Sequence, residues 1–186
     1  MSPGDIGRSI YVPPWRFDIV IRDGLRPPLA AAAIASAAAR ALEAAAAPAP
    51  GSVTVVLTDD EELADLNHEH MGHEGPTDVL SFPMLLPDSF GRAGSHDART
   101  RRRSKAALHR PRTHIGDIAI SVERAVEQAE AGRGGQTGDV RWSAADELRL
   151  LVTHGMLHLC GWDHAKPSDE AAMRTLEQRL LQVERR

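Results

Sequence analysis

The segment that most constrains this chain reads His154-Gly-Met-Leu-His158-Leu-Cys-Gly161-Trp-Asp-His164. Two histidines four residues apart lie on the same face of a helix, so His154 and His158 can bind one metal ion together. Gly161 is expected to end that helix, because glycine readily adopts the left-handed conformation of a C-terminal turn. The turn reverses the chain, and His164 can then supply a third ligand.

Three neutral imidazoles leave the fourth position of a tetrahedral zinc ion open to water, which is typical of a catalytic zinc site. The spacing of the histidines equals that of the metzincin proteases, H-E-x-x-H-x-x-G-x-x-H. In those proteases a glutamate follows the first histidine and acts as the general base, whereas this chain has Gly155 there. Glycine cannot accept a proton. The sequence therefore predicts a catalytic metal site without the usual base of a peptidase.

Hydrophobic periodicity predicts four strands and five helices. The strands are expected at residues 15–22, 53–57, 77–82 and 114–121, where β-branched residues are frequent. The helices are expected at residues 28–47, 59–68, 122–131, from 144 through the histidine segment, and from 167 to the C-terminus. Thr58, Ser121 and Ser143 are interpreted as their N-caps. This order and length fit one α+β domain over residues 1–186, with helices covering the sheet.

Composition and cysteine content indicate a cytoplasmic protein. Hydrophobic residues make up 42% and charged residues 26% of the chain, as in ordinary globular proteins. Residues 1–15 lack the apolar stretch of a secretory signal, and the alanine-rich residues 29–47 are too weakly apolar to span a bilayer. The single cysteine, Cys160, allows no intramolecular disulfide, which suits a reducing compartment. We interpret Cys160 as a small core residue and expect no membrane association.

Four segments of the chain carry a pattern found in one known family. They are Leu66-Asn67, Pro76-Thr77-Asp78-Val79-Leu80-Ser81-Phe82-Pro83, Ile115-Gly116-Asp117-Ile118 and the histidine segment. In this order they resemble the YbeY family of bacterial zinc-dependent endoribonucleases and ribosomal RNA maturation factors. The resemblance implies a zincin-like α+β fold with a mixed four-stranded sheet. It also implies that one Zn²⁺ ion is held by His154, His158 and His164.

The resemblance further implies an endoribonuclease that acts on single-stranded RNA. Its work would be the maturation of ribosomal RNA ends, notably in the small ribosomal subunit, and ribosome quality control in the cytoplasm. Zinc on three neutral imidazoles polarises a phosphoryl oxygen and lowers the pKa of its bound water toward ~7. Hydrolysis of a phosphodiester by this zinc-bound water is therefore the expected chemistry.

The sequence leaves the proton acceptor open. Asp163 and Asp117 are candidates to hydrogen-bond a ligand imidazole, and the alternative for both is a structural bond in a turn or strand. Glu147 lies on the ligand face of the helix, but its position about 10 Å from His154 makes it a poor general base.

Two features depart from the family pattern. The tyrosine and arginine that usually follow the Leu-Asn pair are replaced by His70 and Met71. Methionine cannot bind phosphate as arginine does, so either another basic residue substitutes or activity is reduced. The second departure is a longer, basic segment at about residues 85–112, which we interpret as a flexible insert. Its candidate substrate-binding residues are Arg99, Arg101, Arg102, Arg103 and Lys105.

Two other functions are consistent with the sequence. A zinc peptidase of the zincin type shares the histidine spacing, although Gly155 argues against it. A non-catalytic ribosome-assembly factor with a structural zinc is compatible with Met71. A second metal site at His68, His70 and His73 is also conceivable, but histidines near the C-terminal end of a helix equally suit its dipole.

Overall fold

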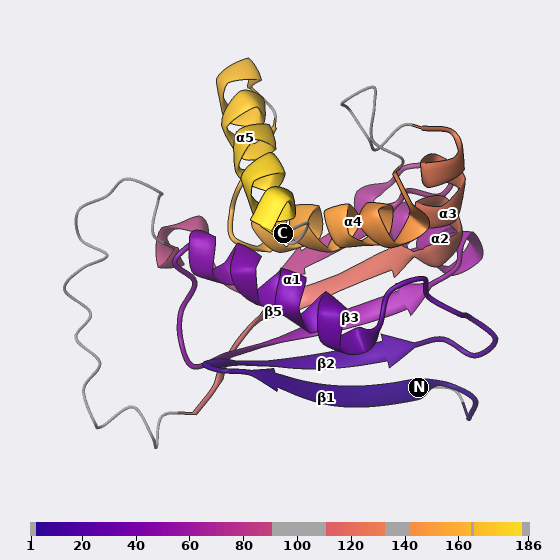
Figure 1. Ribbon diagram of the computed structural model, residues 1–186, viewed down its shortest axis with the longest axis horizontal. Helices are drawn as coiled ribbons and strands as arrows, with labels where there is room; N and C mark the ends of the chain where they lie inside the picture. Colours follow the sequence, from indigo (N-terminus) through magenta and orange to yellow (C-terminus); the bar gives the residue numbers. More distant parts are fainter. Residues whose placement is uncertain (1–2, 91–110, 133–141, 165, 184–186) are drawn as a thin grey trace.

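The computed structural model describes residues 3–90, 111–132, 142–164 and 166–183. Within these residues, five strands form one mixed sheet that packs with five α-helices into a single structure (Figure 1). The strands are β1 Ile6–Val12, β2 Trp15–Ile21, β3 Gly51–Thr58, β4 Val79–Pro83 and β5 Thr113–Ser121. The helices are α1 Ala31–Ala44, α2 Asp60–Met71, α3 Val122–Glu130, α4 Ala144–Leu159 and α5 Pro167–Val183. The expected combination of a mixed sheet with five helices is confirmed.

The strand order in the sheet is β1-β2-β3-β5-β4. β2, β3 and β5 run parallel, whereas β1 and β4 pair antiparallel at the two edges. The expectation of four strands is wrong, because β1 adds a fifth. Most residues of β1 are exposed, and backbone pairing with β2 rather than burial holds the strand in place. The core-facing side chains Ile10 and Val12 of this edge strand are only partly buried, so its apolar pattern is short and weak in the sequence.

Side chains at the helix starts explain where the helices begin. Ser121 and Ser143 cap α3 and α4 as expected. Thr58 is not the cap of α2, because it still belongs to β3. The neighbouring Asp59 accepts a hydrogen bond from the backbone N–H of Glu62 at 2.9 Å and takes that role.

The helices form layers on both faces of the sheet. α1 and α4 cover one face, and α2 covers part of the other (Figure 1). On β5, Ile118 belongs to the large core beneath α1 and α4, whereas the next residue, Ala119, belongs to a small core with Leu63 of α2. Adjacent strand residues point to opposite faces, so β5 contributes to both cores. α5 rises away from the sheet and is anchored by Met173, which is buried in the large core.

Two expectations drawn from composition can be compared with the structure. Cys160 is buried, and burial raises the pKa of its thiol to about 12. The interpretation of this residue as a small core residue is confirmed. Among the helices of the described ranges, none combines the length and the apolar character needed to cross a membrane.

Gly116 allows the close approach of three elements. A Cβ atom at this position would lie 2.5 Å from the carbonyl oxygen of Phe82 on β4 and 2.8 Å from a methyl carbon of Leu159 on α4. The residue also has a φ of 154°, which residues other than glycine rarely adopt. The glycine therefore lets β5 fit between its neighbouring strand and the end of α4.

We expect Gly116→Ala to lower the free energy of unfolding by about 2–4 kcal/mol, because the methyl group meets backbone as well as side chain. Gly24→Ala is the control, since Gly24 also has a positive φ, 78°, but no atom lies within 4 Å of its would-be Cβ. That control should lose only about 1 kcal/mol through backbone strain. Urea unfolding followed by circular dichroism measures both values, and equal losses would contradict the role given to close approach.

Candidate metal centre

The first two histidines are positioned by the way α4 packs on the sheet. Gly155, between them, faces the sheet: a Cβ there would lie 3.0 Å from Cγ2 of Val79 and 3.3 Å from Cγ2 of Ile118. The Ser81 hydroxyl donates a hydrogen bond to the Gly155 carbonyl oxygen at 3.1 Å. A glutamate at position 155 would point into this packed interface, so the missing base of the peptidases could not act from here.

The chain reverses immediately after α4. Gly161 has a φ of 79°; its N–H donates to the carbonyl of His158 at 3.0 Å, and the N–H of Trp162 donates to the carbonyl of Leu157 at 3.1 Å. These two bonds form a Schellman motif, the usual end of a helix at glycine. The predicted helix end at Gly161 is confirmed. The reversal carries His164 back toward the helix that it has just left.

The three histidines form a possible metal site. One ring nitrogen from each of His154, His158 and His164 lies within 4.8 Å of the others, and the Nε2 atoms of His154 and His158 are 3.0 Å apart. Two Zn–N bonds of ordinary length at a tetrahedral angle place their nitrogens about 3.3 Å apart. The nitrogen atoms of these residues therefore fit a small divalent ion. Within the described residues, no other group of histidine, cysteine or carboxylate side chains is gathered in this way.

Glu177 of α5 orients the first histidine, and the sequence did not reveal it. Its Oε1 lies 2.7 Å from Nδ1 of His154, and its side chain is only 13% exposed. A carboxylate on the Nδ1 side leaves Nε2 free to face a metal and makes the imidazole a stronger ligand. Glu177 lies 23 residues after His154. In the sequence, Glu177 is recognisable only as a carboxylate beside Leu176, at the border of the apolar side of its helix. That position alone does not indicate which residue it contacts.

The second histidine is kept neutral by its surroundings. Burial is the main cause that lowers the pKa of His158, and the nearby rings of His154 and His164 add to it. A hydrogen bond with the backbone of Trp162 and the charge of Asp163 act in the opposite direction. Neutral imidazole is the form that binds metal ions, so the lowered pKa favours the ligand form.

The three acidic candidates occupy different places. The carboxylate of Asp163 accepts a hydrogen bond from the backbone N–H of His164 at 2.7 Å and thereby stabilises the turn. Asp117 Oδ1 lies 2.9 Å from Nε2 of His114, and its side chain points to the sheet face opposite Ile118 and α4.

Glu147 is buried in the first turn of α4, where it accepts a hydrogen bond from the indole N–H of Trp142. Burial raises the pKa of this carboxyl group. The sequence-based conclusion that Glu147 is a poor base is consistent with this placement.

The remaining candidates are not brought into the histidine group. On α2, Met71 is 44% exposed, and the His70 ring lies edge-on to Phe82, with 5.2 Å between centroids. His68 Nδ1 instead lies 3.2 Å from Glu74 Oε1. The five basic residues of the insert fall outside the described residues; they are Arg99, Arg101, Arg102, Arg103 and Lys105.

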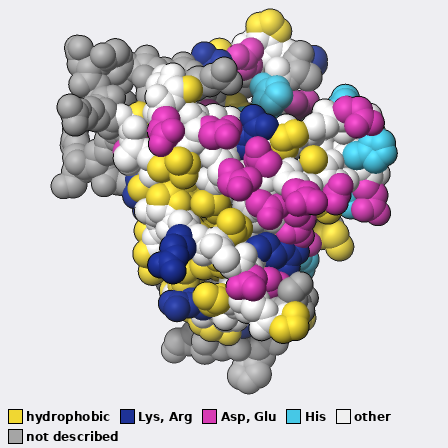
Figure 2. Space-filling view, turned by 90° about the vertical axis from the view of Figure 1, so that its right-hand side faces the viewer, with side chains coloured by type: hydrophobic (Ala, Val, Ile, Leu, Met, Phe, Trp, Pro, Cys, Tyr) yellow, Lys and Arg dark blue, Asp and Glu magenta, His cyan; other side chains and the backbone are white. Residues whose placement is uncertain are grey.

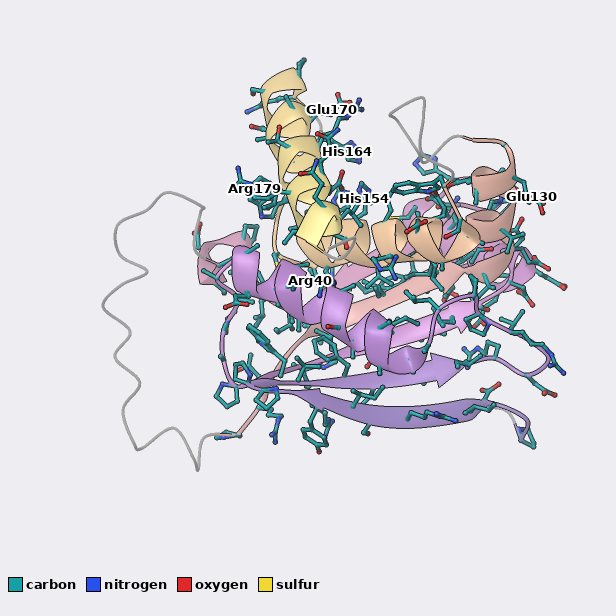
Figure 3. The ribbon with its side chains drawn as sticks, viewed as in Figure 1. Arg40, Glu130, His154, His164, Glu170 and Arg179 are labelled. Carbon is teal, nitrogen blue, oxygen red and sulfur yellow. The ribbon has the colours of Figure 1, made fainter. Side chains whose placement is uncertain are left out.

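An open cleft of about 300 Å³ lies beside the histidine group. His154 and His164 form one side of it, and α5 forms the other (Figure 3). The α5 residues that line the cleft are Glu170, Met173, Arg174 and Glu177. A ligand that enters the cleft can therefore reach both the imidazoles and charged side chains of α5.

Comparison with known proteins identifies the family of this chain. The family model described as Endoribonuclease YbeY matches residues 28–184. Endoribonuclease YbeY of Symbiobacterium thermophilum is 39% identical over 130 residues, covering 70% of this chain and 69% of the relative. The protein of the same description from Salinispora tropica is 42% identical over 130 residues, covering 69% and 71%. A solution structure of a Thermotoga maritima protein aligns with 89% of this chain and 86% of its own, at 21% identity and a TM-score of 0.48. Since the family match extends from before α1 to the end of α5, this chain belongs to the YbeY family of endoribonucleases.

Proposed function

We propose that this protein is a zinc-dependent endoribonuclease that cleaves single-stranded segments of ribosomal RNA. The observation that carries the proposal is the convergence of three imidazole nitrogens at the edge of an open cleft. The named activity of the relatives supports the same reaction. We further propose that it acts in the cytoplasm, in maturation of the small ribosomal subunit and in ribosome quality control.

Zinc suits this set of donors. A catalytic zinc ion usually has three protein ligands, and its fourth position is open to water or substrate. When bound, zinc would polarise a phosphoryl oxygen and lower the pKa of its water toward ~7. A helix with two ligands, packed on a mixed sheet and followed by a glycine turn to the third ligand, also supports a zincin-like classification of the fold.

The residues of this chain would hold and orient the reacting groups. His154, His158 and His164 hold the ion, and Glu177 fixes the ring of His154 through Nδ1. Asp163 supports His164 indirectly, because it stabilises the backbone on which that ligand is carried. We assign Asp117 a structural bond to His114 rather than contact with a ligand ring.

The structure disfavours the peptidase alternative. Position 155, which carries the base in peptidases with the same histidine spacing, faces β4 and β5 instead of the cleft. The other alternative is a non-catalytic ribosome-binding factor with a structural ion. The two functions differ in a measurable way: only the proposed enzyme cleaves RNA in a manner that depends on its metal ligands.

We expect His158→Ala to lose bound zinc and to reduce cleavage of single-stranded RNA by on the order of 10³-fold, because the electrostatic stabilisation of the reacting phosphate is removed. Elemental analysis and a gel assay with and without chelator measure both effects. Circular dichroism controls for folding. A folded variant that keeps cleaving RNA would show that the metal is structural.

We expect Glu177→Gln to weaken zinc binding by about 10–100-fold, since the amide no longer supplies a negative charge to the His154 ring. Competition with a chromogenic chelator measures the affinity. Glu130→Gln is a suitable control, because Glu130 is an exposed residue on α3. Equal zinc affinity in the two variants would exclude the orienting role of Glu177.

We expect Gly155→Glu to gain no peptidase activity and to lose at least about 3 kcal/mol of unfolding free energy, because a carboxylate is forced between α4 and the sheet. Gly155→Ala tests crowding alone and should be milder. Casein digestion and urea unfolding are the measurements. A stable, casein-cleaving Gly155→Glu protein would restore the peptidase alternative.

A further inference from the structure

One face of α5 forms the wall of the cleft opposite the histidines. Glu170, Met173, Arg174 and Glu177 line the cleft; Met173 and Arg174 lie three and four residues after Glu170, and Glu177 lies three residues after Arg174. Residues at this spacing share one side of a helix. A substrate phosphate that reaches the histidines through this cleft passes along this side of α5.

The α5 residues that line the cleft differ in burial and in the contacts that they already make. Glu177 is bound to the His154 ring, and Met173 is 2% exposed and packed in the core. The other two residues, Glu170 and Arg174, lie at the exposed mouth of the cleft. Of the described residues that line the cleft, only Arg174 carries a permanent positive charge.

Arg174 is held by a contact that a substrate can replace. Its Nη2 lies 2.8 Å from Oε1 of Glu170, and the two side chains are 53% and 49% exposed. Exposed ion pairs of this kind contribute at most about 1 kcal/mol. A phosphodiester offers the guanidinium two oxygens in a geometry that it binds well.

The α5 side of the cleft carries two carboxylates, Glu170 and Glu177, and one guanidinium, Arg174. Figure 2 shows Asp and Glu side chains gathered in the middle and right of one face, with Lys and Arg side chains among and below them; carboxylates repel the phosphates of RNA. Met71, on α2, supplies no charge for phosphate binding, and its side chain is exposed. Among the described residues that line the cleft, Arg174 is therefore the cation placed to meet a phosphate there.

We propose that Arg174 binds the phosphate of the RNA that lies at the metal centre, exchanging its contact with Glu170 for the substrate. This inference rests on the proposed endoribonuclease function. Glu170 then acts as a competitor that holds the guanidinium at the cleft mouth in the free protein. The arrangement supplies, from α5, the phosphate-binding arginine that is absent at position 71.

Three variants test the assignment: Arg174→Gln, Glu170→Gln and the control Arg179→Gln. Arg179 has the same charge on the same helix, but it does not line the cleft and lies on the other side of α5 from Glu170 and His164 (Figure 3). Two measurements are made on each full-length variant. The first is kcat and KM of the zinc-loaded protein on a short single-stranded RNA. The second is the affinity of the metal-free protein for that RNA at several salt concentrations.

We expect Arg174→Gln to raise KM and the dissociation constant about tenfold. The slope of log affinity against log salt should fall by about 0.7, the value for one lost phosphate contact on a single strand. Glu170→Gln should strengthen binding a few-fold, because Arg174 is released, and Arg179→Gln should stay within about twofold of the wild type. A role of Arg174 in folding alone would leave the salt slope unchanged.

The results separate failure of this inference from failure of the proposed function. If the wild type cleaves RNA and Arg174→Gln matches Arg179→Gln, the phosphate role is wrong and the endoribonuclease stands. If the zinc-loaded wild type does not cleave RNA, the function is wrong, and the salt slope alone decides whether Arg174 contacts phosphate. A collapse of kcat in Glu170→Gln would overturn the competitor role, because Glu170 would then take part in the reaction itself.

Discussion

The geometry of the candidate site depends on the close contact between α4 and the sheet. At Gly155 the helix backbone lies directly against the side chains of Val79 and Ile118, and the carbonyl of Gly155 accepts a hydrogen bond from the Ser81 hydroxyl. Successive helix residues are rotated by about 100°, so a helix fixed against the sheet at position 155 directs His154 toward α5. The contact of α4 with the sheet at Gly155 thus leaves no room for the glutamate base of the peptidases. It also sets the direction in which His154 points.

The parts of the fold that local interactions determine could be predicted from the sequence. The spacing of His154 and His158 needs only a helix, and the turn at Gly161 needs only a residue that accepts a positive φ. The caps at Ser121 and Ser143 are also local, since each side chain bonds a backbone N–H three residues ahead. In all these cases the residues that interact are close neighbours in the chain.

The parts that depend on distant segments could not be predicted in the same way. β1 is stabilised mainly by pairing with β2, and only Ile10 and Val12 of this strand pack against the core, so its strand pattern is too short to stand out in the sequence. Glu177 meets His154 only because α5 packs against α4, and no spacing in the sequence encodes that contact. Asp117 was considered as support for a ligand ring, but its side chain lies on the sheet face away from Ile118. A register shift in the pairing of β3 with β5 brings it to the same face as His114, with which it pairs.

The packing of α5 connects metal binding with substrate binding. Met173 and Leu176 anchor this helix in the core, and Glu177 and Arg174 extend from it toward the histidines and the cleft mouth. The Cα atoms of Arg174 and Glu177 keep a fixed separation, because they lie about one turn apart on the same helix. The exposed guanidinium of Arg174 can still move between Glu170 and a substrate. One helix therefore positions both the Glu177 carboxylate, which orients His154, and the Arg174 guanidinium, which we propose binds phosphate. Any displacement of α5 from α4 would change both together.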